Sequence, residues 1–134
     1  MNNILAKSNY IKNNLSVIIP CRNEEINLTD NIFLYKSLSE NVLELIFIND
    51  DSTDLTEKVL NDHYSSFAKI VNVHEKHPDY LGKNFACLQG YKEATGEYFL
   101  FLDEDVKIKN FSFLLDVEYD KDIVTTFLPY FYNK

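Results

Sequence analysis

Three carboxylates follow an apolar segment in the second half of the chain. Residues 98–102 read YFLFL, and Asp103, Glu104 and Asp105 come directly after them. Neighbouring carboxylates at a buried edge repel one another and lose hydration, so they are tolerated when they stay solvated or when a cation lies among them. Two aspartates one residue apart suit a hard divalent cation, which shares its remaining positions with water and phosphate oxygens. The spacing therefore predicts a Mn²⁺ or Mg²⁺ site that would hold a diphosphate and stabilise it as a leaving group.

Polar residues also follow two earlier apolar segments. Residues 15–20 (LSVIIP) lead into CRNEE, and residues 42–49 (VLELIFIN) lead into DDSTD. Each stretch also has a plain structural explanation, since Ser52 or Thr53 can cap a helix and acidic residues favour the positive end of its dipole. The three glycines of the chain form neither GxGxxG nor GxxxxGK[ST], so a backbone-only phosphate site is not expected. Because such polar residues follow three strand-like segments, a shared site for a metal ion and a diphosphate explains them better than unrelated helix caps and solvated turns would.

Strand-like and helix-like segments alternate along the chain and must position these residues. Short runs rich in β-branched and aromatic residues predict strands at 15–20, 42–49, 68–75, 97–103 and 122–127. Apolar residues at helical spacing predict helices at 25–39, 53–63, 83–95 and about 110–118. This alternation is typical of an α/β fold, a doubly wound, mostly parallel sheet with helices on both faces. Such a sheet would gather the polar residues at the carboxyl ends of its strands, where ligands bind.

Composition narrows the class of protein. The 134 residues are 46% hydrophobic and 25% charged, which predicts a single domain over residues 1–134. A net charge of −8 argues against nonspecific binding to nucleic acid or to an anionic membrane surface. No apolar run reaches the roughly 18 residues of a membrane span and the N-terminal segment is too polar for a signal peptide, so we expect a cytoplasmic protein. Cys21 and Cys87 lack the spacing of a zinc site or a disulfide framework.

Three segments together resemble the nucleotide-sugar-binding half of a family 2 glycosyltransferase, which has the GT-A fold and a DxD motif. They are LSVIIPCRNEEINL, LELIFINDDSTDLTEKVL and GKNFACLQGYKEATGEYFLFLDEDV, and the resemblance covers about residues 14–127. It implies metal-dependent transfer of a sugar from a nucleoside diphosphate sugar, usually a UDP-sugar, to an acceptor hydroxyl with inversion. The implied partners are that donor and an acceptor glycan or lipid-linked acceptor, because the pattern is most similar to bacterial members that act on lipid or polyprenoid-type acceptors.

The resemblance also implies roles for residues at the strand ends. Contacts to the base and ribose fall on the end of the first strand and the residues after it, Pro20, Cys21, Arg22 and Glu24. The residue that reads the base edge falls on the Asn49-Asp50 pair, and either member is a candidate. Lys83 would approach the diphosphate as a positive point charge. Asp103 would meet the ribose or the metal, and Asp105 the metal.

The chain is short for a member of this family. Residues 13–109 hold the motif-bearing core, and residues 110–134 are expected to add a helix, a strand and an aromatic tail. Family members continue into a half that binds the acceptor and supplies the catalytic base, and no base can be assigned among the 29 residues after Asp105. Two hypotheses follow: a glycosyltransferase, or a non-catalytic nucleotide-sugar-binding subunit. In the second, a homo-oligomer or another chain would complete the fold, and a partner could hold it at the inner face of the membrane.

Two other classes that gather acids at strand ends fit less well. Phosphatases and receiver domains place their key aspartate after the first strand, where this chain has Pro20, Cys21 and Arg22. A nucleotidyltransferase typically begins with a loop rich in Gly, Arg and Lys, and this chain has none.

Overall fold

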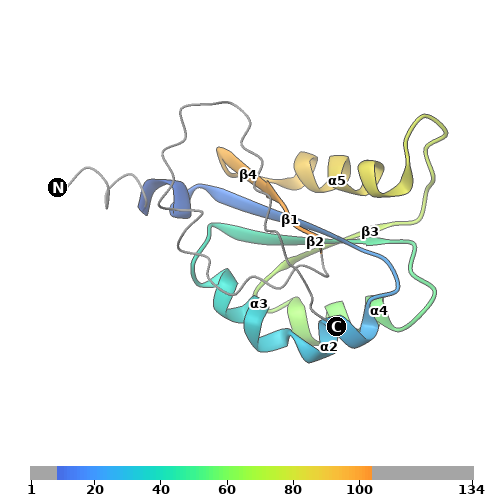
Figure 1. The fold of residues 1–134 in the computed structure, drawn as a ribbon, viewed down its shortest axis with the longest axis horizontal. Coiled ribbons are helices and arrows are strands. Elements are labelled where there is room, and N and C mark those ends of the chain that lie inside the picture. The colour runs from blue at the N-terminus through green and yellow to red at the C-terminus, as the bar shows by residue number, and fades with distance from the viewer. Residues whose placement is uncertain (1–8, 104–134) are drawn as a thin grey trace, which may run out of the picture.

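The computed structural model describes residues 9–103, and a four-stranded parallel sheet forms the centre of this part of the chain (Figure 1). Its strands are β1 (Leu15–Cys21), β2 (Glu44–Asp50), β3 (Lys69–Val73) and β4 (Tyr98–Phe101). The order across the sheet is β3-β2-β1-β4, and all three pairings are parallel. The prediction of a doubly wound parallel sheet is thereby confirmed.

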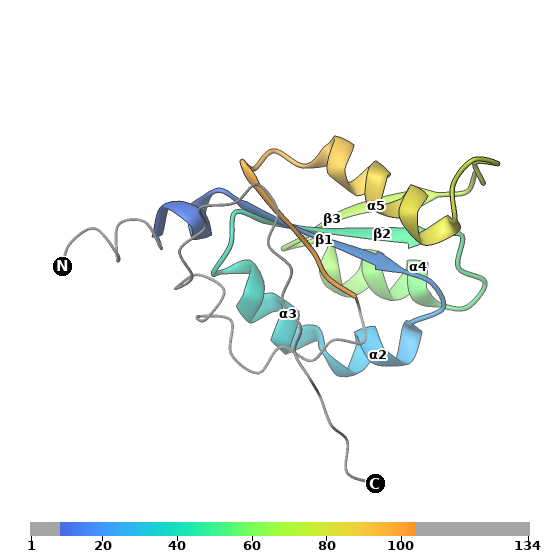
Figure 2. The same ribbon diagram turned by 45° about the horizontal axis from the view of Figure 1, so that its top comes forward.

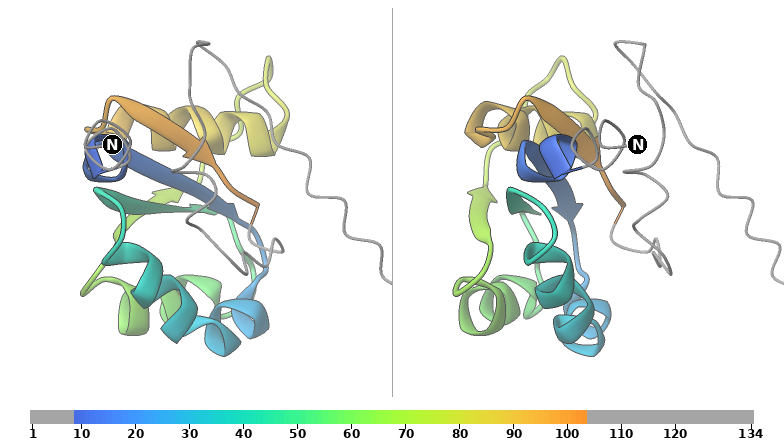
Figure 3. Two further views of the ribbon diagram at one scale, coloured as in Figure 1. Left: turned by 60° about the vertical axis from the view of Figure 1, so that its left-hand side comes forward. Right: turned by 90° about the vertical axis from the view of Figure 1, so that its left-hand side faces the viewer.

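Helices cover both faces of the sheet. They are α2 (Glu25–Asp30), α3 (Ile32–Ser39), α4 (Thr56–Val59), the π-helical turn η1 (Leu60–Tyr64) and α5 (Gly82–Glu93). Figure 3 shows α5 on one face and the other helices on the opposite face. Strand side chains alternate between the two faces, so Ile19 and Phe47 pack beneath α2, α3 and η1, whereas Ile18 and Ile48 pack beneath α5. Both faces of the central strands are buried, which explains their continuous apolar sequences.

An aromatic cluster anchors the helices on the first face. The rings of Tyr35, Phe47 and Tyr64 lie with their centroids 4.9 to 5.8 Å apart. The Tyr64 hydroxyl donates a hydrogen bond of 2.6 Å to the carbonyl of Leu28 in α2, and burial raises the pKa of this tyrosine. The contact satisfies a carbonyl near the end of a six-residue helix, where the chain turns at Asn31 into α3.

Helix α5 approaches the sheet closely on the second face. A Cβ added to Gly90 would lie 2.5 Å from Ile18 Cγ2 and 2.6 Å from Ile48 Cδ1. Only a residue without a side chain fits at this distance, so Gly90 sets how far α5 stands from β1 and β2. The first turn of α5 then lies near the ends of those strands, where their arrowheads point (Figure 2).

Within residues 9–103, the element predictions are correct in kind and wrong at several boundaries. The helix predicted at 25–39 is interrupted at Asn31, and the one predicted at 53–63 begins only at Thr56. Neither Ser52 nor Thr53 caps α4, because both bind Asn23 instead. Strand β4 ends at Phe101 rather than at 103. The helix predicted at about 110–118 and the strand predicted at 122–127 lie outside the described residues.

Candidate functional site

The parallel register brings the carboxyl ends of the strands to one edge of the sheet. Cys21, the last residue of β1, pairs with Asn49 in β2, and Asp50 at the end of β2 pairs with Val73 at the end of β3. Strand β4 runs parallel to β1, with Ile18 opposite Phe101. The loops after β1, β2 and β4 therefore leave the sheet on the same side, as expected for a ligand site in an open α/β fold.

Two loops at this edge are held together by side-chain hydrogen bonds. Asn23 has a φ of 54°, which an asparagine tolerates, and its Oδ1 accepts a bond of 2.8 Å from the backbone N–H of Thr53. In the opposite direction, the N–H of Asn23 donates to Ser52 Oγ at 3.1 Å, and the N–H of Glu24 donates to Thr56 Oγ1 at 2.8 Å. These bonds fix the loop after β1 against the loop after β2. The sequence prediction missed Asn23, whose only signal is an asparagine two residues after the end of a strand.

Asp50 lies against the first turn of α5. A Cβ added to Gly82, the first residue of this helix, would lie 3.1 Å from Asp50 Oδ2. Gly82 thus lets the carboxylate of β2 and the backbone of α5 approach each other, a role that the sequence prediction did not assign to it. Among residues 9–103 no side chain caps α5, whose preceding residue Leu81 is extended. The positive end of the α5 dipole therefore faces this part of the site.

Lys83 connects the first turn of α5 to Asp103, two residues after the end of β4. Its Nζ lies 2.5 Å from Asp103 Oδ1, and both side chains are about half exposed, at 55% and 48%. An exposed ion pair of this kind contributes about 0 to 1 kcal/mol to stability, so an incoming ligand can replace it at small cost. Asp50, Gly82, Lys83 and Asp103 together form what we call the α5 cluster.

The predicted pair Asn49-Asp50 divides into a buried and an accessible residue. Asn49 is 1% exposed; its Nδ2 donates to Asn72 Oδ1 at 3.0 Å and its Oδ1 accepts from the N–H of Ser52 at 3.3 Å. The Asn49 amide therefore joins β2 to β3 and to the following loop. Asp50 is only partly buried. The next residue, Asp51, has a φ of 49°, and its Oδ1 lies 3.8 Å from His74 Nδ1.

The predicted residues at the end of β1 divide in the same way. Pro20 and Cys21 are buried within the strand, and Cys21 belongs to the core beneath α2. Arg22 is exposed and Glu24 is partly buried, both in the loop that follows. Only these two of the four predicted residues present accessible side chains at the sheet edge.

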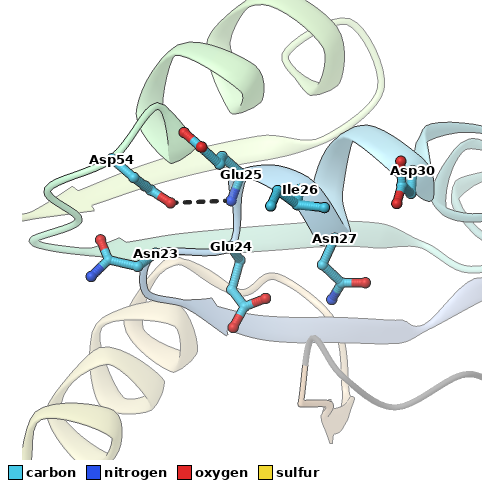
Figure 4. A pocket seen from close by; sticks show the side chains of 7 residues that line it. All are labelled: Asn23, Glu24, Glu25, Ile26, Asn27, Asp30 and Asp54. Atoms are coloured by element: carbon cyan, nitrogen blue, oxygen red, sulfur yellow. Dashed lines mark hydrogen bonds between the residues drawn. The ribbon is translucent and has the colours of Figure 1, made fainter.

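A hollow of about 430 Å³ lies beside this loop (Figure 4). Apart from Ile26, the residues that line it are all Asn, Asp or Glu: Asn23, Glu24, Glu25, Asn27, Asp30 and Asp54. Figure 4 shows Glu25 next to Asp54 and Glu24 pointing to the opposite side. Burial alone would raise the pKa of Asp54, but hydrogen bonds from Thr56 and from the N–H of Glu25 outweigh it and lower the pKa. With four carboxyl groups on its wall, the hollow repels a diphosphate unless cations accompany it.

Of the two predicted metal ligands, Asp103 lies among the described residues. Within residues 9–103, no group of three or more His, Cys, Asp and Glu side chains is arranged to hold a metal ion. Asp103 supplies a half-exposed carboxylate, an oxygen donor of the kind that Mg²⁺ and Mn²⁺ prefer. Asp105, the other predicted ligand, lies outside the described residues.

Among residues 9–103, no helix has the length and apolar character needed to cross a membrane.

Known proteins match this chain both in sequence and in structure. A family model described as Glycosyl transferase family 2 matches residues 16–110. The 4,4'-diaponeurosporenoate glycosyltransferase of Staphylococcus haemolyticus is 36% identical over 100 residues, which are 72% of this chain and 25% of that protein. The protein of the same name from Staphylococcus aureus strain USA300 is 31% identical over 99 residues, covering 73% of this chain and 25% of that protein.

Two solved structures share the fold. Staphylococcus aureus TarS 1-349 aligns with a TM-score of 0.53 and 25% identity, over 68% of this chain and 27% of that one. A mannosyltransferase from Pyrobaculum calidifontis, solved in complex with GDP-Man and Mn²⁺, aligns with a TM-score of 0.57 and 20% identity, over 77% of this chain and 30% of that one. The chain spans about a quarter of the length of the curated relatives that it matches. With a family match over most of its length and a GT-A-type sheet, the chain belongs to glycosyl transferase family 2.

Proposed function

We propose that this chain binds the nucleoside diphosphate sugar in a glycosyltransferase that transfers the sugar to an acceptor hydroxyl with inversion. The observation that carries the proposal is the α5 cluster, in which a carboxylate of β2, the first turn of a helix, a lysine and the aspartate after β4 lie at one sheet edge. A diphosphate needs positive groups and a base or ribose needs hydrogen-bonding groups. The cluster offers both within one short stretch of surface.

Lys83 and the first turn of α5 are the groups proposed to receive the diphosphate. The α5 dipole and the uncapped N–H groups of its first turn favour an anion at this end of the helix. Lys83 adds a full positive charge on a flexible stem that can turn from Asp103 to a phosphate oxygen. A divalent cation at Asp103 and Asp105 would supply Lewis-acid stabilisation of the leaving diphosphate. The P. calidifontis neighbour was solved with Mn²⁺, which supports this choice of cofactor.

Asp50 is the proposed reader of the base edge, in preference to Asn49. The Asn49 amide is buried and bound to Asn72 and Ser52, whereas the Asp50 carboxylate is accessible beside α5. Arg22 and Glu24 are the proposed contacts of the ribose and base from the loop after β1, and UDP is the proposed nucleotide. Pro20 and Cys21 would shape the site through the backbone, because their side chains are buried.

The acceptor is proposed to be lipid-like or lipid-linked. Two of the relatives are named 4,4'-diaponeurosporenoate glycosyltransferases, which supports an apolar acceptor. We further propose one nucleotide-sugar-binding domain over residues 1–134, located in the cytoplasm or held at the inner membrane face by a partner. A non-catalytic binding subunit remains the second candidate, because the chain matches only a quarter of its relatives and holds no recognisable catalytic base. A second copy or another chain would then complete the enzyme.

Calorimetric titration with UDP, GDP and their sugars, with and without Mn²⁺, tests the donor site. We expect Lys83→Gln to weaken UDP binding about 10- to 100-fold, since a hydrogen bond to a charged group contributes about 1.5 to 3 kcal/mol. Asp103→Asn and Asp105→Asn are expected to remove the dependence on Mn²⁺. Lys58→Gln is the matched control, because Lys58 is also an exposed lysine in an ion pair, with Asp62 on the opposite face.

The outcomes separate the hypotheses. If Lys83→Gln binds as tightly as the Lys58→Gln control, the α5 cluster does not hold the diphosphate and the proposal is wrong. If UDP binds with Mn²⁺ but the purified chain neither hydrolyses nor transfers the sugar of UDP-glucose, the binding subunit is favoured over the enzyme.

A further inference from the structure

The loops after β1 and β2 are joined to each other through side chains, in a set of bonds that we call the loop clasp. The N–H groups of Asn23, Glu24 and Glu25 donate hydrogen bonds to Ser52 Oγ, Thr56 Oγ1 and Asp54 Oδ2, at 3.1, 2.8 and 3.3 Å. In the opposite direction, Asn23 Oδ1 accepts bonds of 2.8 and 3.3 Å from the N–H and Oγ1 of Thr53. Among residues 9–103, no backbone-to-backbone hydrogen bond joins these two loops. Their spacing therefore depends on side chains, which a single substitution can change.

Asn23 takes part in the loop clasp in both directions. Its N–H donates to Ser52, and its side-chain oxygen accepts from Thr53. Its φ of 54° lies in the left-handed region, where a short polar side chain is tolerated better than most others. A residue at this position must therefore adopt a left-handed backbone and also carry a side-chain acceptor, and asparagine does both.

The loop clasp lies between the residues proposed to contact the base and the ribose. Arg22 and Glu24 adjoin Asn23 on one loop, and Asp50 lies two residues before Ser52 at the start of the other. Figure 4 shows the side chains of Asn23 and Glu24 pointing in different directions, so the Glu24 carboxylate lies apart from the bonds that Asn23 makes. A nucleoside that touches both loops would bind more tightly when their spacing is already fixed, because less ordering is needed on binding.

We propose that Asn23 is a positioning residue for the nucleotide. Through the loop clasp it holds Arg22 and Glu24 at a fixed spacing from Asp50, so that both loops contact the base and ribose of one nucleotide. Asn23 itself makes no contact with the nucleotide. The diphosphate is proposed to bind at Lys83 and the first turn of α5, outside the clasp, so a loosened clasp weakens binding of the nucleoside part alone. This inference rests on the proposed function, because it takes the ligand to be a nucleoside diphosphate.

Calorimetric titration of the full chain with UDP and with inorganic pyrophosphate, each with Mn²⁺, separates the two parts of the ligand. The measured quantity is the ratio of the UDP affinity to the pyrophosphate affinity. Asn23→Gly allows the left-handed backbone but removes the side-chain acceptor. It should lower the ratio about 3- to 10-fold, the factor that corresponds to the net strength of one hydrogen bond. Asn23→Asp keeps the acceptor and should leave the ratio unchanged, because repulsion from the added charge weakens both ligands.

A variant on the other loop tests the same clasp without a change in the loop after β1. Ser52→Ala removes the acceptor of the Asn23 N–H and should lower the ratio by a similar factor. Ser65→Ala is its matched control, because Ser65 also loses one Oγ hydrogen bond, to the Asn61 carbonyl, at an exposed position outside the clasp. The control should keep the ratio of the parent.

The outcomes distinguish this inference from the proposed donor site. If Asn23→Gly and Ser52→Ala keep the ratio of the parent while Lys83→Gln weakens both ligands, the donor site stands and this inference alone is wrong. An equal loss of UDP and pyrophosphate affinity in Asn23→Gly would also overturn it, because a general loss of structure would explain that result. So would a ratio in Asn23→Asp as low as in Asn23→Gly. A parent chain that binds neither ligand would overturn the donor site and this inference together.

Discussion

Replacing Gly90 by alanine should loosen the contact between α5 and the sheet. The added Cβ would lie 2.5 Å from Ile18 Cγ2 and 2.6 Å from Ile48 Cδ1, about 1 Å closer than ordinary van der Waals contact. The Ile48 Cδ1 methyl can move by a change of the terminal rotamer. The Ile18 Cγ2 methyl is bonded directly to the Cβ of a residue in a central strand, and the restricted χ1 angle of isoleucine keeps it in place. The helix must therefore shift outward. Overpacking of this kind costs about 1 to 3 kcal/mol, and the close approach places Gly90→Ala in the upper half of that range.

The higher helix propensity of alanine offsets part of this loss of stability. Alanine is favoured over glycine in a helix interior by about 1 kcal/mol. Subtracting this gain from a steric cost of about 2 to 3 kcal/mol leaves Gly90→Ala less stable by about 1 to 2 kcal/mol. Urea unfolding followed by circular dichroism measures the difference, as a lower midpoint with an unchanged slope.

Asn84→Ala is the matched control, because it also introduces alanine into α5 but at an exposed position. There the helix preference acts without a clash, so stability should stay the same or rise by a few tenths of a kcal/mol, roughly the difference in propensity. A Gly90→Ala protein as stable as the parent or more so would refute the reasoning. It would mean that α5 is not held against the sheet at the distance given by the structure.

Two further perturbations test other contacts of the fold. Tyr64→Phe removes the hydroxyl that donates to the Leu28 carbonyl, and we expect urea unfolding to show a loss of about 1 to 2 kcal/mol with the near-ultraviolet dichroism retained; no loss would mean that water replaces the hydroxyl. For Glu44, burial alone would raise the pKa, but hydrogen bonds from Ser16 Oγ and from the N–H and Oγ1 of Thr95 outweigh it and lower the pKa below its usual 4.5. A lowered folded-state pKa means that the carboxylate stabilises the protein above pH 4.5 and that this stabilisation is lost as the pH falls through the folded-state value. The stability difference between the parent and Glu44→Gln should thus be largest at pH 7 and shrink below pH 4.5, and a difference that stays constant with pH would contradict this assignment.

The sequence alone was sufficient for the class of fold and for the approximate position of the strands in the described residues. Continuous apolar runs such as VIIP and LIFI have no polar face, so they belong in a sheet covered on both sides, and the spacing between them leaves room only for helical crossovers. The resemblance to family 2 glycosyltransferases, carried by several linked segments, is confirmed by the family match over residues 16–110. The roles of the predicted site residues stay predictions, and Asp105 itself lies outside the described residues.

Helix boundaries could not be read in the same way. Residues 25–39 have one apolar periodicity, yet the helix is interrupted at Asn31. The Asn31 side chain donates a hydrogen bond to the Asn27 carbonyl, and the Tyr64 hydroxyl donates one to the Leu28 carbonyl. That hydroxyl comes from a residue 36 positions away. A partner so distant in the sequence leaves no local signal.

What the sequence determined by itself is which polar residues lie near the ends of strands, because strand propensity and apolar patterning are properties of neighbouring residues. Only the tertiary structure decided which of them face outward. Asn49 and Asp50 are adjacent and both polar, but Asn72 on the neighbouring strand takes the Asn49 amide, while Gly82 allows the first turn of α5 to approach the Asp50 carboxylate. Likewise, Lys83 and Asp103 are 20 positions apart and meet because α5 begins, and β4 ends, at the same edge of a parallel sheet. Such pairings depend on the register between strands and the distance of a helix from them, and both are fixed only when the whole sheet is assembled.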